Sequence, residues 1–150
     1  GPSDFEVGDQ KRYFSLDGNF SYIPIICYEI IFYWKIINSI NKKSDFIINI
    51  TNDVWFGNLI GPYQHFYLTK LRSSEFNKTI IRVSNNGISA IFDKNSNIIY
   101  NTDLNKKMNF RKKIVFESTD SNFLKLHTIT NYILYFSFLF FIFINFKEYD

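Results

Sequence analysis

The sequence predicts a layered α/β domain followed by a membrane-spanning helix. Short isoleucine-rich apolar runs alternate with segments in which apolar residues recur at helical spacing, a pattern typical of strands covered by helices. An uncharged apolar segment of 18 residues, 129–146, follows. It has the length needed to cross about 30 Å of hydrocarbon at about 1.5 Å per residue. With 150 residues, 46% of them hydrophobic, the chain is long enough to enclose a core and too apolar to be disordered.

The composition excludes several classes of function. The formal charge is only +3, and the 17 basic residues are scattered, so no basic stripe indicates a nucleic-acid partner. A single cysteine excludes an internal disulfide and a cysteine-rich metal site. The two histidines, His65 and His127, lie far apart and lack the spacing of metal ligands. We therefore expect no metal.

The first elements are expected to be a hairpin and a helix. Residues 13–16 and 20–26 form the hairpin strands, and the second strand is apolar throughout at 23–26, as in a strand covered on both faces. Pro24 fits less well, because proline cannot donate to a strand ladder and favours edges. After Cys27 the period becomes helical, and the helix is expected to end at 41–43.

One more strand and one more helix are expected before the chain becomes a meander. Residues 45–51 form a buried strand, 52–62 a loop, and a helix begins at Pro62 and ends near Asn77, since proline suits the first turn of a helix. The remaining expected strands are 79–84, 88–93, 98–100 and 114–117. The first two are joined at Asn85-Asn86-Gly87, because an Asn-Gly pair favours a tight turn.

Two interpretations fit residues 129–146. A membrane-spanning helix is favoured, because the uninterrupted run of Phe, Ile and Leu is too long for an ordinary buried helix. A helix in a soluble core is the alternative. Lys147 is opposed by Glu148 and Asp150, so charge does not set an orientation across the membrane.

Cys27 ends a predicted strand and begins a predicted helix. At such a corner the thiol meets free backbone N–H groups and the positive end of the helix dipole, which favour the thiolate. The N–H of Tyr28 is placed to bind an oxyanion formed when the thiol attacks a carbonyl. By these features alone, a buried inert cysteine is the more common case.

Five motifs change this interpretation. In order they are ICYE at 26–29, NDVWFG at 52–57, GPYQH at 61–65, LRSSE at 71–75 and RVSNNGISA at 82–90. Together they resemble the second half of the carbon–nitrogen hydrolase (nitrilase) domain, in the form found in apolipoprotein N-acyltransferases. The resemblance implies part of a nitrilase-type αββα sandwich. Residues 1–125 would be the C-terminal half of that domain, 129–146 a transmembrane helix and 147–150 a tail.

The resemblance also implies an activity. Cys27 would take the sn-1 acyl chain of a phospholipid as a thioester and pass it to the N-terminal diacylglyceryl-cysteine of a lipoprotein. The partners would be the phospholipid donor, the lipoprotein acceptor and the membrane, with no cofactor. The expected location is the bacterial inner membrane, with the catalytic domain on the periplasmic side.

Other residues in these motifs are candidates for the site. Glu29 is either a second acidic group beside the thiol or a carboxylate that complements the helix dipole. Trp55 and Phe56 either wall the acyl pocket or pack as ordinary aromatics. Asn52, Arg82 and Asn85 are candidate substrate-binding residues, and for the last two a structural role is favoured.

Residues on the predicted helix 62–77 are expected to be structural. His65 is interpreted as a hydrogen-bonded structural residue. Arg72 and Glu75, three positions apart, are expected to pair on the helix surface.

The general-base glutamate and oxyanion-binding lysine of the family precede the nucleophile, and neither is matched here. We therefore expect an upstream half that carries them, and we expect this chain to be inactive alone. The alternatives are an amidase of the same superfamily, which the apolar terminal segment argues against, and a non-catalytic remnant or a subunit of a split enzyme.

Overall fold

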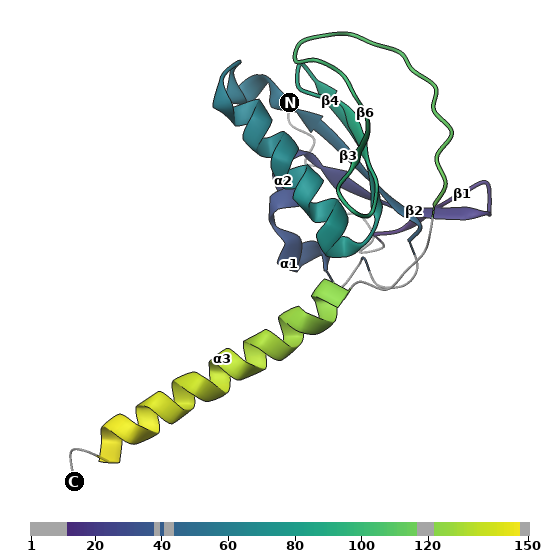
Figure 1. Cartoon of the computed structure of the whole chain (residues 1–150). Coiled ribbons are helices and arrows are strands. Elements are labelled where there is room, and N and C mark those ends of the chain that lie inside the picture. Colours follow the sequence, from purple (N-terminus) through teal and green to yellow (C-terminus); the bar gives the residue numbers. More distant parts are fainter. Residues whose placement is uncertain (1–11, 38–39, 41–43, 117–121, 148–150) are drawn as a thin grey trace, which may run out of the picture.

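A mixed six-stranded sheet with helices on one face forms the domain (Figure 1). The computed structural model describes residues 12–37, 40, 44–116 and 122–147. The strands lie in the sheet in chain order: β1 (Phe14–Leu16), β2 (Phe20–Ile26), β3 (Phe46–Asn52), β4 (Thr79–Asn85), β5 (Ala90–Phe92) and β6 (Ile98–Asn101). The central strands β2, β3 and β4 are parallel, and the outer ones pair antiparallel. The predicted α/β class is confirmed.

Helical segments connect the parallel strands, because parallel neighbours require a crossover. They are the 3₁₀ helices η1 (Cys27–Ile31) and η2 (Asp53–Phe56) and the α-helices α1 (Tyr33–Ile36) and α2 (Ile60–Phe76). α1 and α2 lie on the same side of the sheet (Figure 1). α2 begins two residues before Pro62, which is tolerated because N–H groups in a first turn lack partners within the helix. It ends at Asn77 in the left-handed conformation (φ 53°).

The single helix expected after Cys27 is wrong. The chain forms η1, turns at Phe32 (φ −84°, ψ 60°) and continues as the short α1. Arg72 explains the break: its Nε donates to the carbonyl of Ile30 (3.1 Å) and its Nη2 to that of Ile31 (3.3 Å). A continuous helix would need these two carbonyls for its own ladder. The expected helix end at 41–43 lies outside the described residues.

The strand expected at 114–117 is also wrong over 114–116, and Glu117 lies outside the described residues. This stretch belongs to the long loop that leaves β6 and passes around the side of the sheet away from α2 (Figure 1). Aromatic packing, and not strand pairing, holds this stretch against the sheet. The Phe116 ring stacks on Phe46 (centroids 4.5 Å apart) and meets Phe20 edge-on (5.5 Å).

Pro24 is compatible with its strand because of how β1 ends. β1 pairs with β2 only at 20–22, so beyond Tyr22 no strand among the described residues pairs with that side of β2. The prolyl nitrogen needs no partner there, while the other side of the strand pairs with β3.

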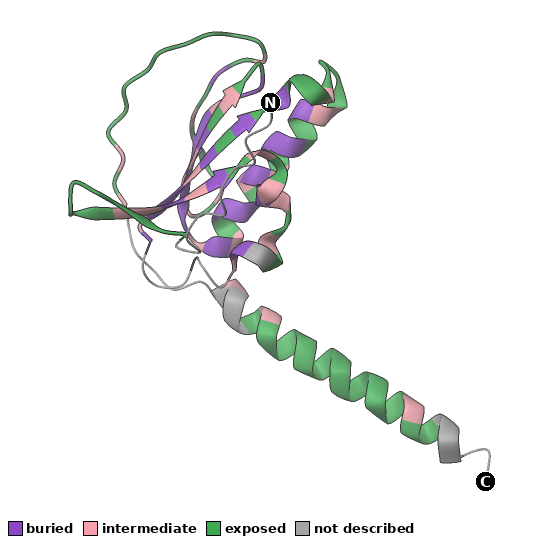
Figure 2. Ribbon diagram, turned by 180° about the vertical axis from the view of Figure 1, so that it is seen from behind, coloured by how far each residue is buried: buried purple, intermediate pink, exposed green. Residues whose placement is uncertain are grey.

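The two faces of the sheet differ sharply (Figure 2). On the helix-covered face, Ile23, Ile47 and Ile80 lie side by side in register and are all 0% exposed. On the other face, Ile26, Ile50 and Val83 are also in register, with exposed fractions of 59%, 51% and 51%. The core therefore lies between the sheet and α1 and α2, and on the opposite face this apolar row is not covered by any described element.

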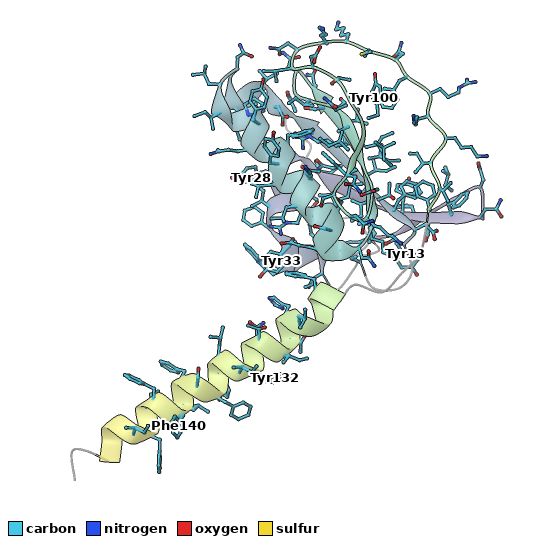
Figure 3. All side chains as sticks on the ribbon, viewed as in Figure 1. Tyr13, Tyr28, Tyr33, Tyr100, Tyr132 and Phe140 are labelled. Carbon is cyan, nitrogen blue, oxygen red and sulfur yellow. The ribbon has the colours of Figure 1, made fainter. Side chains whose placement is uncertain are left out.

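The last element, α3 (Asn122–Lys147), is 26 residues long and projects away from the domain (Figure 1). Its stretch Leu126–Ile144 has 19 residues, a mean hydropathy of 1.6 and no buried residue, so by length and composition it fits a membrane span. Tyr33 lies near the base of this helix (Figure 3), and its hydroxyl is 3.2 Å from Nε2 of His127. This contact ties α3 to the helical layer of the domain.

Candidate functional site

Cys27 occupies the corner at which β2 ends and η1 begins. Its φ of +50° is unusual for a residue with a side chain and costs about 1–2 kcal/mol. The sharp corner leaves the thiol partly exposed at the carboxyl end of the parallel strands. The strand–helix junction expected from the sequence is therefore present, with a backbone strain that the sequence does not reveal.

Polar side chains replace isoleucine on the helix-covered face as the strands approach this corner. In β3 the buried positions run Ile47, Asn49, Thr51, and in register with them β4 has Ile80 and Arg82 followed by Ser84. Thr51 lies nearest the thiol: its hydroxyl is 3.4 Å from Cys27 Sγ. The core thus ends in a polar cluster directly below the cysteine.

Asp53 is the centre of this cluster and is only 1% exposed. Its Oδ1 accepts a hydrogen bond from Nδ1 of His65 (2.8 Å), and its Oδ2 accepts from Nη2 of Arg82 (2.5 Å) and from the hydroxyl of Ser84 (2.9 Å). Burial alone raises the pKa of Asp53, but the hydrogen bond from His65 and the charge of Arg82 lower the pKa to about 2. Asp53 is therefore a fixed carboxylate and no proton acceptor near neutral pH.

Arg82 spans the floor of the cluster. It is 1% exposed and donates to the carbonyl of Ile88 (3.1 Å), Asn49 Oδ1 (2.9 Å) and Thr69 Oγ1 (3.0 Å), besides Asp53. Burial lowers the pKa of Arg82, and the charge of Asp53 opposes this shift. Its hydrogen-bonding groups are directed inside the protein, which agrees with the structural role that the sequence favoured.

Gly87 explains the glycine of the predicted Asn-Gly turn. A Cβ there would lie 2.0 Å from Asp53 Oδ2 and 2.2 Å from Ser84 Oγ, so any side chain would collide with the cluster. The positive φ of the turn (59°) belongs to Asn86 instead. Glycine is required here for close approach to a carboxylate and not for its freedom of φ.

Hydrogen bonding favours the ionised form of the thiol. Partial burial raises the pKa of Cys27, but hydrogen bonds from Thr51 and from the backbone at Asn52 and Tyr28 lower it by more. The negative charge of Asp53 acts weakly in the opposite direction. The pKa of the thiol therefore lies below its ordinary value, as a nucleophile requires.

Glu29, Asn52 and Tyr28, expected to lie in the site with Cys27, each make different contacts. Glu29 accepts from the backbone N–H of Ile26 (3.2 Å) and pairs with Arg12 (2.5 Å), the contacts of a carboxylate at a helix N-terminus. The side chain of Asn52 accepts from the N–H of Val54 (3.2 Å) and caps η2. Tyr28 lies beside α2 (Figure 3), and its ring centroid is 5.6 Å from that of His65.

The loop residues are more open. Trp55 is 84% exposed, while the half-buried Phe56 lies 5.7 Å from the ring of Tyr28 and 5.3 Å from that of His65. Asn85 lines a hollow between the end of β4 and residues 105–109. No contact brings Asn85 to the thiol among the described residues.

Sequence reasoning missed Thr51, Asp53 and Asn49. A signal was available, because polar residues at alternate positions of a strand otherwise filled with isoleucine fall on the buried face. It also misplaced the Arg72–Glu75 pair: the two side chains do bond, but Arg72 is 7% exposed and holds the backbone of η1 instead of lying on the surface. Within the described residues, no three His, Cys, Asp or Glu side chains gather as metal ligands would.

Comparisons of the sequence with known proteins match most of the chain to one family. The family model for carbon-nitrogen hydrolases matches residues 5–110. An apolipoprotein N-acyltransferase of Wigglesworthia glossinidia brevipalpis is 45% identical over 80 residues, or 53% of this chain and 16% of that protein. Another from Rickettsia bellii is 43% identical over 98 residues, or 65% of this chain and 19% of that protein. The chain thus spans less than a quarter of the length of these relatives.

Solved structures agree on the fold. A CN-hydrolase superfamily protein from Xanthomonas campestris has a TM-score of 0.51 at 14% identity and covers 68% of this chain and 43% of its own. Saccharomyces cerevisiae Nit3, of the nitrilase superfamily, has a TM-score of 0.52 at 17% identity, with coverages of 68% and 40%. These likenesses support the nitrilase-type fold expected from the sequence.

Proposed function

Because the chain belongs to the carbon–nitrogen hydrolase family, we propose that it supplies the nucleophile of an apolipoprotein N-acyltransferase. The observation that carries the proposal is the Cys27 thiol, held at a strained strand–helix corner in a segment similar to the relatives that bear this name. Residues 1–125 are then the C-terminal half of the hydrolase domain, followed by a transmembrane helix at 129–146 and a short tail at 147–150.

The reaction has two acyl transfers. The Cys27 thiolate attacks the sn-1 ester carbonyl of a phospholipid; a carbon–sulfur bond forms, the ester carbon–oxygen bond breaks, and the lysophospholipid alkoxide leaves with a proton. The free amino group of a lipoprotein's diacylglyceryl-cysteine then attacks the thioester; an amide bond forms, the thiolate leaves and the amine loses a proton. The N–H of Tyr28 stabilises the oxyanion in both steps.

The proton transfers require a base that accepts and returns a proton. Asp53 is unsuited because its pKa is about 2. We assign the base to a glutamate, and further oxyanion stabilisation to a lysine, of an upstream half of the domain. Glu29, which pairs with Arg12, is a second acidic group of the site in this scheme.

The upstream half has a surface on which to pack. Ile26, Ile50 and Val83 form an exposed apolar row in register on the face of the sheet opposite α1 and α2. A second sheet from the upstream half would bury this row and complete an αββα sandwich, in which two sheets pack face to face about 10 Å apart.

The substrates explain the apolar parts of the chain. Phospholipid and lipidated acceptor both reside in the bilayer, so α3 anchors the domain where they are found, at the bacterial inner membrane with the domain on the periplasmic side. Trp55 and Phe56 line the path of the acyl chain, and Asn52, Arg82 and Asn85 shape the site from the ends of β3 and β4.

A chimera tests the proposal. The matching segment of the Wigglesworthia glossinidia brevipalpis relative is replaced by this chain, and the N-terminal peptide of a lipoprotein is analysed by mass spectrometry. We expect an added N-acyl chain, its loss in Cys27→Ala, and its retention in the matched Ala variant of the partly buried Ser96, a turn residue remote from the corner.

Other outcomes would contradict the proposal. Release of ammonia from small amides without N-acylation would favour the amidase alternative. Neither product, from a chimera that folds and inserts, would favour a non-catalytic remnant.

A further inference from the structure

We propose that Thr51 is a positioning residue for the nucleophile: its hydroxyl donates a hydrogen bond to the Cys27 sulfur whenever that sulfur carries negative charge. The inference rests on the proposed function of Cys27 as acyl carrier. It concerns a residue on β3 that is 5% exposed and whose hydroxyl lies 3.4 Å from Sγ.

The direction of the Thr51 proton follows from counting donors. The hydroxyl has one proton and two acceptors in reach, Cys27 Sγ at 3.4 Å and Asp53 Oδ1 at 3.2 Å. Asp53 already accepts from His65, Arg82 and Ser84 at 2.5–2.9 Å. The carboxylate keeps these three shorter bonds when the Thr51 proton turns toward the sulfur, where no other side-chain hydroxyl donates among the described residues.

The cluster behind Thr51 is electrically balanced. An ionised carboxylate only accepts hydrogen bonds, so Nδ1 of His65 carries the proton that bonds Asp53. The buried Nε2 of His65 has no hydrogen-bond partner within the described residues. The negative Asp53 is then offset by the positive Arg82, and a thiolate beside the cluster meets little net repulsion.

The charged and titratable groups around the sulfur come from every neighbouring element. They are Tyr28 and Glu29 on η1, Asp53 on η2, His65 on α2 and Arg82 on β4, with Arg12 paired to Glu29. Of these, Asp53 is hydrogen-bonded to Thr51, and His65 and Arg82 are hydrogen-bonded to Asp53. Thr51 is therefore the route by which the cluster orients a donor toward the thiol.

The bond has a defined part in each acyl transfer. The sulfur is negative before it attacks the ester and again when it leaves the thioester, and it is neutral in between. A donor fixed by the cluster stabilises both charged states without giving up its proton, since an alcohol is far too weak an acid to do so. Thr51 consequently raises the fraction of the thiol that is ionised for forming the thioester and lowers the barrier for releasing it.

The single cysteine makes a direct test practical. The full chain in detergent is alkylated with iodoacetamide over a range of pH, and the rate is followed by mass spectrometry. We expect Thr51→Val, which keeps the shape and removes the hydroxyl, to move the midpoint of the rate profile upward by roughly one pH unit. Alkylation near neutral pH should fall by up to about tenfold. Thr51→Ser should restore the midpoint.

Thr69→Val is the matched control. Thr69 is 0% exposed and accepts from Arg82 in the same cluster, but it makes no hydrogen bond to the sulfur. The midpoint of the alkylation profile of Thr69→Val should equal that of the native chain. Circular dichroism should show that each variant folds. An equal shift in both valine variants, or none in either, would overturn the inference.

Should Thr51→Val not fold, Thr51→Ser and Thr51→Asn still decide the question. Asn keeps a donor, and a midpoint at least as high as that of a free thiol in both would overturn the inference. The chimera assay separates this inference from the proposed function. Normal acylation with an unshifted Thr51→Val profile refutes only the role of Thr51, whereas a shifted profile without acylation refutes only the acyltransferase.

Discussion

The two faces of the central sheet are built from the same three strands, yet they are fitted to different neighbours. Ile23, Ile47 and Ile80 are sealed beneath α1 and α2, whereas residues three positions further along each strand form a row with about half of each side chain exposed: Ile26, Ile50 and Val83. All six side chains are aliphatic. Burial here is decided by the layer that covers each face and not by residue type.

The difference between the two faces supports the proposed upstream half. An antiparallel sheet commonly leaves one face to water and places polar residues there, but parallel strands are typically covered on both faces. The uncovered row of this sheet keeps the composition of a buried one. The face is therefore suited to a second apolar layer, which is the place that we assign to the upstream half.

The largest effect should come from a charge on the covered face. Ile47→Asp buries a carboxylate without a partner and should lower the free energy of unfolding by more than about 4 kcal/mol. Ile50→Asp, three residues away on the open face, should change it by less than about 1 kcal/mol. Urea unfolding of the chain in detergent, followed by tryptophan fluorescence, measures both.

Variants of Ile50 also test the proposed second sheet. In the chimera, Ile50→Asp should abolish N-acylation because the aspartate would lie between two sheets, while Ile50→Leu should retain it. Full acylation with Ile50→Asp would show that the face remains open to water in the assembled enzyme.

An intermediate effect is expected at the polar end of the covered face. Folding lowers the pKa of Asp53 from an ordinary 3.8 to about 2, so its ionisation stabilises the fold above about pH 4. This stabilisation should be lost as pH falls from about 4 toward 2. Asp53→Asn should cost about 3 kcal/mol at neutral pH, since it leaves Arg82 buried without a counter-charge, and it should flatten the acid dependence. Thermal unfolding across this pH range is the measurement.

Asp93 provides the comparison for that experiment. Hydrogen bonds from Asn97 and Asn95 also lower the pKa of Asp93, but it sits in a turn, partly open to solvent. Asp93→Asn should remove a smaller share of the acid dependence. Equal contributions from the two residues would mean that the buried cluster is no more strongly coupled than a surface turn.

The smallest effect concerns the contact between the domain and α3. Tyr33→Phe removes the hydroxyl that lies 3.2 Å from His127 and should weaken docking of the helix base by about 0.5–1.5 kcal/mol. Amides around His127 should then exchange up to about tenfold faster. Tyr132→Phe, at a site 62% exposed on α3, is the control and should leave exchange unchanged. Unaltered protection in Tyr33→Phe would mean that ring packing alone holds the helix.

Strands and helices with strong periodicity were predictable, and those that depend on a distant side chain were not. The hairpin, β3, α2 and the apolar α3 follow from local patterns. The helix after Cys27 breaks because Arg72, more than forty positions later, takes the carbonyls of Ile30 and Ile31. Residues 114–116 have strand-like composition, but Phe116 is held by stacking on Phe46.

The candidate site shows the same division. Cys27 and its motif stand out in the sequence because residue type and order carry the information. Thr51 and Asp53 become part of the site only because β2, β3 and β4 end at one edge of the sheet, which brings residues up to 33 positions apart into hydrogen bonds. The need for Gly87 likewise follows from a carboxylate more than thirty residues earlier in the chain.

By itself the sequence determined the α/β class, the strand–helix corner at the cysteine and the long apolar terminal segment, since each follows from composition and period within a short stretch of chain. Only the tertiary structure decided which polar residues lie beneath the thiol, where the helix breaks and which sheet face stays open. These depend on parallel register and on distant partners, and no local pattern encodes the distance between two strands.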